Sequence, residues 1–157
     1  MNRYHTSAVV LAVALVASGV ASAEMSRNVI ATFRGQLVVS KAEIPDGKNE
    51  KETIAKIKAA KLTELAGETS NEITHWNFHY TAFLTQTGAS SLKLEFYRDG
   101  KQYAADKRLD GVDPKSAVLT GQISIDEDEG LARGKSYVIK LVNSKDVVVA
   151  STPLLMK

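Results

Sequence analysis

Residues Leu131–Tyr137 read LARGKSY, and the chain runs on directly into VIKLV at Val138–Val142. The second stretch alternates between apolar and polar side chains with the two-residue period of a β-strand. In front of it stand a leucine, a glycine and a tyrosine, each three residues from the next. Three such residues ahead of a strand indicate a fixed turn at the entrance to a β-layer.

The same alternation recurs through most of the chain. Seven segments have the composition or the period of strands: Val29–Ser40, His75–Gln86, Leu92–Tyr97, Lys101–Leu109, Val118–Ile125, Ser136–Asn143 and Asp146–Met156. Asp99–Gly100 between two of them is a strong hairpin signal, and Gly121 is expected to form a bulge in another. Seven closely spaced strands predict a mainly β domain that folds as a two-sheet sandwich.

One helix is predicted between the first two strands, over about Glu50–Ala66. Asn49 can cap its start, Glu52 stands three residues later as in a capping box, and Gly67 is placed to end it. The apolar side of this helix is narrow, which is typical of a helix that lies on the edge or the face of a sheet.

With these strands in place, Leu131, Gly134 and Tyr137 resemble the tyrosine corner of fibronectin type III and related immunoglobulin-like sandwiches. The resemblance implies a seven-stranded sandwich in which the Tyr137 hydroxyl returns to upstream backbone at a corner between the sheets. The leucine would close the end of the sandwich, and the glycine would permit the turn. Arg133 replaces the usual proline, and the inserted helix is not a family feature. The whole chain is also faintly similar to exported bacterial proteins of unknown activity.

The first residues are predicted to be a cleaved secretory signal peptide. Ser7–Val20 is an almost unbroken run of Ala, Val and Leu, and Ala21-Ser22-Ala23 has the small residues of a cleavage site. The run is shorter than the ~20 residues of a spanning helix, so a membrane anchor is the less favoured alternative. Residues 1–23 are therefore expected to be removed, leaving 24–157 as one exported β-sandwich domain in the periplasm or the medium.

The exported domain is nearly neutral and has no cysteine. It keeps all 18 acidic residues and every one of the 20 basic residues except Arg3. Binding to nucleic acid, which needs clustered basic charge, is therefore not expected. The lack of cysteine excludes disulfides, thiol catalysis and thiolate metal sites. Since the domain also has no Asn-X-Ser/Thr acceptor site, the chain is interpreted as a bacterial envelope or secreted protein.

Two groups of residues could bind a metal. His75 and His79 would share one face of a strand, but four residues at ~3.3 Å each put them about 13 Å apart, too far for one ion. They are interpreted as polar residues of a solvent-facing side. The densest acidic run consists of Asp126, Glu127, Asp128 and Glu129. These carboxylates are candidate Ca²⁺ ligands, although their spacing does not match a calcium loop and a solvated turn is the alternative.

Two further features have both a structural and a binding interpretation. Trp76, Phe78 and Tyr80 could form a carbohydrate platform, but their spacing is that of a core face, which is the favoured interpretation. The helix region carries lysines that could contact an anionic surface such as phospholipid headgroups, or could form an ordinary solvated face. These are Lys48, Lys51, Lys56, Lys58 and Lys61.

The sequence contains no set of catalytic motifs, such as a nucleophile elbow, a phosphate-binding glycine loop or an HExxH zinc motif. The expected function is that of a non-catalytic binding module without a cofactor, whose partner is an envelope or secreted protein or a glycan. Loops or a sheet edge would bind the partner, and Pro153 suggests that the last strand lies at such an edge. The alternative is a protein that binds a small ligand or Ca²⁺, or a minor enzyme, through the acidic run at 126–129.

Overall fold

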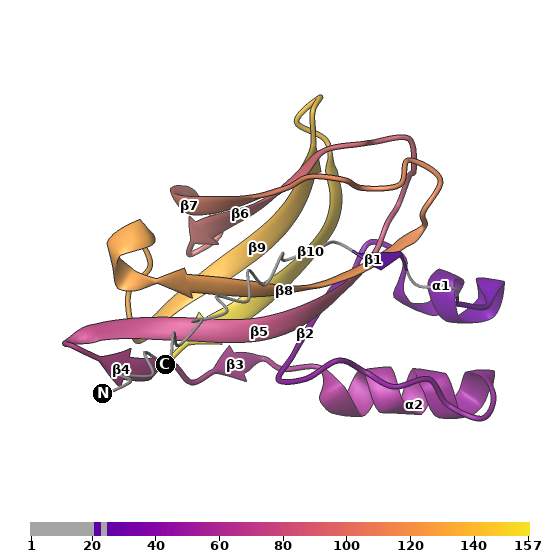
Figure 1. Ribbon diagram of the computed structural model, residues 1–157, viewed down its shortest axis with the longest axis horizontal. Helices are drawn as coiled ribbons and strands as arrows, with labels where there is room; N and C mark the ends of the chain where they lie inside the picture. Colours follow the sequence, from indigo (N-terminus) through magenta and orange to yellow (C-terminus); the bar gives the residue numbers. More distant parts are fainter. Residues whose placement is uncertain (1–20, 23–24) are drawn as a thin grey trace, which may run out of the picture.

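The computed structural model describes Ala21, Ser22 and residues 25–157. In these residues the protein is mainly β, with two sheets and two α-helices (Figure 1). The two helices lie at the same end of the molecule, at the right of the figure. Apart from Ala21 and Ser22, the signal peptide predicted over residues 1–23 lies outside the described residues.

Sheet A is antiparallel throughout and has the strand order β1-β8-β5-β2, with a short fifth strand, β4, paired to the start of β5. Its strands are β1 (Ala21–Ser22), β2 (Leu37–Ser40), β4 (Glu68–Ser70), β5 (Ile73–Phe83) and β8 (Val118–Asp126). The long strand β5 is the centre of this sheet, because β8 pairs along one side of it while β2 and β4 share the other side.

Sheet B has the order β3-β10-β9-β6-β7, and only β3 runs parallel to its neighbour. Its strands are β3 (Glu64–Leu65), β6 (Leu92–Arg98), β7 (Gln102–Leu109), β9 (Lys135–Asn143) and β10 (Val148–Met156). The described residues thus contain ten strands instead of the seven expected. The additional strands β1, β3 and β4 are only two or three residues long, too short to produce a recognisable alternation.

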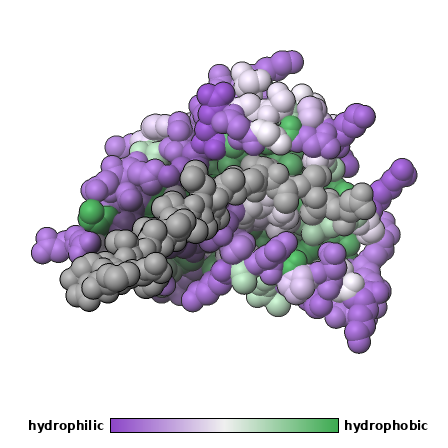
Figure 2. Space-filling view, in the orientation of Figure 1, coloured by the Kyte–Doolittle hydropathy of each residue, from purple (hydrophilic) through white to green (hydrophobic). Residues whose placement is uncertain are grey.

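Both sheets contribute to one main hydrophobic core. Trp76 and Phe78 from sheet A join Phe96 and Ile139 from sheet B in it, and all four side chains are fully buried. The interpretation of the β5 aromatic row as a core face is therefore confirmed, and the carbohydrate-platform alternative is wrong. On the side of the molecule shown in Figure 2, hydrophilic side chains form most of the outline, with smaller hydrophobic areas between them.

The first predicted strand is half helix. Residues Arg27–Phe33 form α1, and only Leu37–Ser40 are extended, as β2. Ser26 caps the helix by accepting a hydrogen bond from the Val29 backbone N–H at 3.4 Å. Val29 and Phe33, four residues apart, lie on one side of the helix and are buried in a second, smaller cluster, where Phe33 contacts Phe83 with ring centroids 5.1 Å apart. This contact with distant residues selects the helix over the strand that β-branched composition favours.

The predicted helix is present as α2, Glu50–Ala60, between β2 and β3. Its start agrees with the prediction, because the Asn49 side chain accepts from the Glu52 backbone N–H at 2.9 Å. The Glu52 carboxylate in turn accepts from the Lys48 backbone N–H, also at 2.9 Å. The helix ends at Ala60 and not at Ala66. Gly67 therefore does not terminate it; this glycine lies beyond β3, in contact with sheet A.

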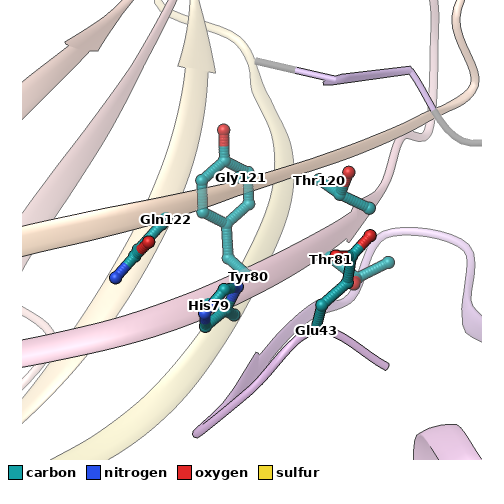
Figure 3. Close-up of a pocket in the computed structure, with 7 residues that line it drawn as sticks. All are labelled: Glu43, His79, Tyr80, Thr81, Thr120, Gly121 and Gln122. Atoms are coloured by element: carbon teal, nitrogen blue, oxygen red, sulfur yellow. The ribbon is translucent and has the colours of Figure 1, made fainter. Parts of the chain in front are cut away.

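Gly121 forms no bulge, because the pairing of β5 with β8 continues without a shift from one end to the other. Gly121 lies directly opposite Tyr80 in that pairing, and the Tyr80 ring crosses β8 at this point (Figure 3). A Cβ atom on residue 121 would lie 2.7 Å from the Tyr80 hydroxyl oxygen. The glycine is thus needed for the close approach of an aromatic ring rather than for an extra residue in the strand.

The stretch at Leu131–Tyr137 carries the chain from sheet A to sheet B. After β8 comes a 3₁₀ turn, η1 (Glu127–Glu129), and β9 then begins at Lys135. The Tyr137 hydroxyl accepts a hydrogen bond from the Ala132 backbone N–H at 2.9 Å. Leu131 and Tyr137 are buried, and Gly134 has a φ of +69°, in the left-handed region that favours glycine. One side chain therefore fixes the crossing between the two layers.

We expect Tyr137→Phe to lower the free energy of unfolding by about 1 kcal/mol, because the partly buried Ala132 N–H loses its acceptor. Chemical unfolding followed by circular dichroism measures this change. An unchanged midpoint would contradict a structural role for the hydroxyl.

Tyr80→Phe is the matched control for that substitution. The Tyr80 side chain is equally buried, but among the described residues its hydroxyl has no hydrogen-bond partner, and burial raises its pKa to about 12. Removal of an unsatisfied buried hydroxyl is expected to leave the protein as stable as before, or more stable by about 1 kcal/mol. If Tyr137→Phe and Tyr80→Phe lower the free energy of unfolding equally, the hydrogen bond of the Tyr137 hydroxyl does not account for the loss of stability.

Candidate functional site

The outer face of sheet B carries a row of partly exposed apolar side chains that crosses four strands. In the strand register Tyr97 lies opposite both Tyr103 and Val138, and Val138 lies opposite Pro153. Tyr97, Val138 and Pro153 each have a buried core residue next to them along the strand, such as Phe96 beside Tyr97, so these three side chains point outward. The Tyr103 ring contacts the Tyr97 ring and lies on the same face. We call Tyr103, Tyr97, Val138 and Pro153 the tyrosine stripe. Pro153 is exposed, and 51% of the Tyr103 surface is accessible.

The two tyrosine rings are held in a fixed arrangement. Their centroids are 5.8 Å apart and the planes meet at 80°, an edge-to-face pair. The Lys140 ammonium group lies 4.0 Å from the centre of the Tyr97 ring, in a cation–π contact. The Tyr97 hydroxyl donates to Glu95 at 2.9 Å, and the Tyr103 hydroxyl donates to Asp106 at 2.6 Å.

These hydrogen bonds raise the pKa of both hydroxyls. The hydrogen bond to the Glu95 carboxylate raises the pKa of Tyr97, and the bond to Asp106 raises the pKa of Tyr103 to about 12. Both phenols therefore remain neutral donors at physiological pH. Glu95 also pairs with Lys93 at 2.9 Å. Because the charges beside the stripe are paired with one another, the surface left for a partner is the exposed aromatic and apolar part, bordered by polar groups.

The acidic run folds as the turn η1 and its N-cap Asp126. Its carboxylates accept hydrogen bonds from, or pair with, different groups of the protein. Asp126 and Glu129 form a capping box, each side chain accepting from the other's backbone N–H at 3.2 Å. Glu127 accepts from the Thr74 backbone N–H at 2.9 Å, which lowers its pKa. Glu129 also pairs with Lys107. Nowhere in the described residues do three His, Asp or Glu side chains come together as a metal-binding group.

We expect Asp126→Ala to lower the free energy of unfolding by about 1 kcal/mol through loss of the η1 cap. The loss of stability should be the same with and without Ca²⁺. The test is a thermal unfolding series with and without Ca²⁺ for the wild-type protein and the variant. A calcium-dependent rise in the wild-type midpoint that the variant lacks would contradict the structural role and favour a calcium site.

The two histidines lie in different surroundings on β5. His75 is opposite Asp126 in the strand register, and its Nδ1 atom lies 3.6 Å from the Asp126 carboxylate. His79 lines a shallow groove of about 210 Å³ on the outer face of sheet A (Figure 3). The residues around the groove are Glu43, His79, Tyr80, Thr81, Thr120, Gly121 and Gln122. Most of these residues have polar side chains, and the groove borders β8. It could not be predicted from the sequence, because the segments that form it are far apart in the chain.

The lysines of the helix region are partly engaged within the molecule. Lys56 pairs with Glu52 at 3.3 Å, the expected contact between residues four apart, and also donates to the Asp46 carbonyl at 2.9 Å. Lys61 donates to the Gln36 side chain at 3.1 Å. These contacts favour an ordinary solvated helix face over a dedicated anion-binding surface.

No family model matches the chain, and no curated protein matches its sequence. Among the described residues, no helix is both long and apolar enough to cross a membrane. The function is therefore argued from the surfaces themselves. In the part of the chain that the structure describes, Tyr103 of the tyrosine stripe is the one aromatic residue among the exposed large hydrophobic side chains.

Proposed function

We propose that this protein is an exported, non-catalytic binding module built on an immunoglobulin-like sandwich of the fibronectin type III kind. The proposal is supported by the sheet order, in which β2, β5 and β8 face β6, β7, β9 and β10. It is also supported by the Tyr137 hydroxyl bond at the point where the chain passes from one sheet to the other. Export rests on the signal-peptide features of residues 1–23, with the periplasm or the medium as destination.

The observation that carries the binding proposal is the exposure of Tyr103 at the end of the tyrosine stripe. Tyrosine is enriched at the energetically dominant positions of protein interfaces because it combines a large apolar area with few rotatable bonds. The edge-to-face contact with Tyr97 restrains the Tyr103 ring before binding, which reduces the entropy lost on association. We therefore propose an envelope or secreted protein as the partner, with a glycan as the alternative.

The proposal includes no catalysed reaction and no bound cofactor. The polar groups nearest the stripe, Glu95, Asp106 and Lys93, are hydrogen-bonded to one another or to the tyrosines. Such pairing suits a binding surface with a polar border better than a site that must transfer protons to a substrate. The acidic turn at 126–129, the basis of the calcium or enzyme alternative, has a sufficient structural explanation in its capping box.

The test is capture of partners from an envelope extract of the producing organism by the immobilised exported chain. Tyr103→Ser should reduce capture of a recurrent partner at least tenfold, as expected for a central interface tyrosine. Val147→Ser is the matched control, because Val147 is a similarly exposed apolar residue, 41% accessible, in the turn between β9 and β10. Equal capture by the two variants would contradict the proposal. Loss of capture after periodate treatment of the extract would identify the partner as a glycan.

A further inference from the structure

The edge strands of the two sheets differ in how well they are protected against pairing with a strand of another chain. In sheet B the edge strand β7 carries three consecutive charged residues, Asp106, Lys107 and Arg108, and its pairing with β6 is interrupted by a bulge. Both features are common protections against pairing with another chain. The opposite side of this sheet is covered from within, because β3 pairs with the end of β10 and the Ser151 N–H donates to the Gly35 carbonyl at 3.0 Å. The last strand, β10, is therefore not the free edge that Pro153 suggested.

The edge of sheet A formed by β8 lacks these protections. Residues 118–125 read VLTGQISI, with no charged residue and no proline. On the side away from β5, only Leu119 and Thr120 have a strand partner among the described residues, namely the two residues of β1. That partner belongs to the predicted signal peptide, so cleavage after Ala23 would remove it. The outward side chains of Gln122 and Ser124 are exposed and uncharged. Such an edge offers a row of unpaired backbone groups to a second strand.

We infer that β8 pairs antiparallel with β8 of a second copy of this chain. Two identical strands that pair antiparallel are related by a two-fold axis, so the interface closes on itself and yields a dimer. The axis would pass near Gln122, in the middle of the uncharged stretch. The short β1 already pairs antiparallel with this edge, which shows that the edge is open to a strand in that direction.

The charges at the two ends of β8 favour a second copy as the occupant. The acidic turn at 126–129 follows the strand, and Lys115 precedes it, two residues after Asp113. Antiparallel pairing brings the acidic turn of each copy toward the Lys115 end of the other copy and keeps the two acidic turns apart. The inference does not depend on the proposed partner of sheet B. It would, however, place two tyrosine stripes on one particle, which strengthens binding to a multivalent partner.

To test the inference, the chain is purified after export, and its mass is measured by sedimentation velocity over a range of concentrations. The wild-type protein should show a concentration-dependent dimer. Gln122→Lys should raise the dissociation constant at least tenfold, because it places two like charges beside the two-fold axis. The matched control is Asn77→Lys, since Asn77 is exposed on the same sheet but lies on the central strand β5. This variant should form the dimer as the wild-type protein does.

A mixing experiment separates a charge effect from a folding defect. Gln122→Lys and Gln122→Glu should each be monomeric, and a mixture of the two should recover the dimer, because opposite charges then meet at the axis. A wild-type protein that remains monomeric at every concentration would overturn the inference. It would also be overturned by a dimer that Gln122→Lys leaves intact, or by one that Tyr103→Ser dissociates.

Discussion

Replacing Gly121 by alanine is expected to lower the free energy of unfolding by about 3 kcal/mol, the upper part of the range for inserting atoms into a well-packed core. The new Cβ would lie 2.7 Å from the Tyr80 hydroxyl oxygen and 2.8 Å from two atoms of its ring. The ring is buried between the sheets with 1% of the residue exposed, so it cannot move aside into solvent. Chemical unfolding of both proteins measures the difference.

A double-mutant cycle shows whether the clash with the ring is the cause. In a Tyr80→Leu background the aromatic ring is gone, and Gly121→Ala should then cost much less than it does in the wild-type background. If the alanine costs the same in both backgrounds, the loss arises from the strand backbone, and the explanation by close approach is wrong.

Gly67→Ala is expected to lower the free energy of unfolding by a similar amount, about 3 kcal/mol, at the glycine that does not end α2 as predicted. A Cβ atom there would lie 2.4 Å from the Thr74 Cγ2 atom and 2.8 Å from the Trp76 Nε1 atom. The indole N–H donates to the Lys157 carbonyl at 3.1 Å, and the Gly67 backbone N–H donates to the same oxygen at 2.7 Å. The substitution therefore pushes against a buried ring and disturbs the two hydrogen bonds that this Lys157 oxygen accepts.

Two measurements report this change. Trp76 is the only tryptophan of the chain, so its fluorescence emission should shift to longer wavelength if the indole is displaced toward solvent. The unfolding midpoint should fall in parallel. Thr74→Ser removes the methyl group that the new Cβ would meet, so it should restore part of the stability when combined with Gly67→Ala. Normal emission together with a wild-type midpoint would contradict the assigned contacts.

The strands that could be predicted are those with strong local signals. The aromatic row of β5 alternates regularly. Asp99 and Gly100 both have positive φ, 50° and 72°, in the three-residue turn between Arg98 and Gln102, and an Asp-Gly pair is a signal for such a hairpin turn. The start of α2 was predictable for the same reason, since Asn49 and Glu52 are near in sequence. Features that depend on contacts between residues far apart in the sequence could not be predicted. The sequence does not reveal that Phe83 stabilises α1, nor which ring lies opposite Gly121.

The same limit applies to the candidate site. The alternation in Leu92–Tyr97 puts Tyr97 on the side opposite Leu92, Leu94 and Phe96. Nothing in the sequence indicates that Tyr103 lies beside it, because the bulge between β6 and β7 shifts the register at this point. Lys140 reaches the Tyr97 ring from a strand far along the chain. The acidic turn is different: an aspartate at 126 followed by a glutamate at 129 is itself a local capping-box signal, and it indicates the structural role directly.

The central claim, that the protein binds its partner through the tyrosine stripe, is tested most directly by site-specific photo-cross-linking in intact cells of the producing organism. A photoreactive phenylalanine analogue is introduced at position 103, and in separate strains at position 147 as the exposed apolar control and at position 122 on the edge of β8. A discrete cross-linked product with another envelope or secreted molecule is expected from position 103, and none from position 147. Cross-links to such a molecule that form from 147 or 122 but not from 103, or none from any position, would contradict this claim.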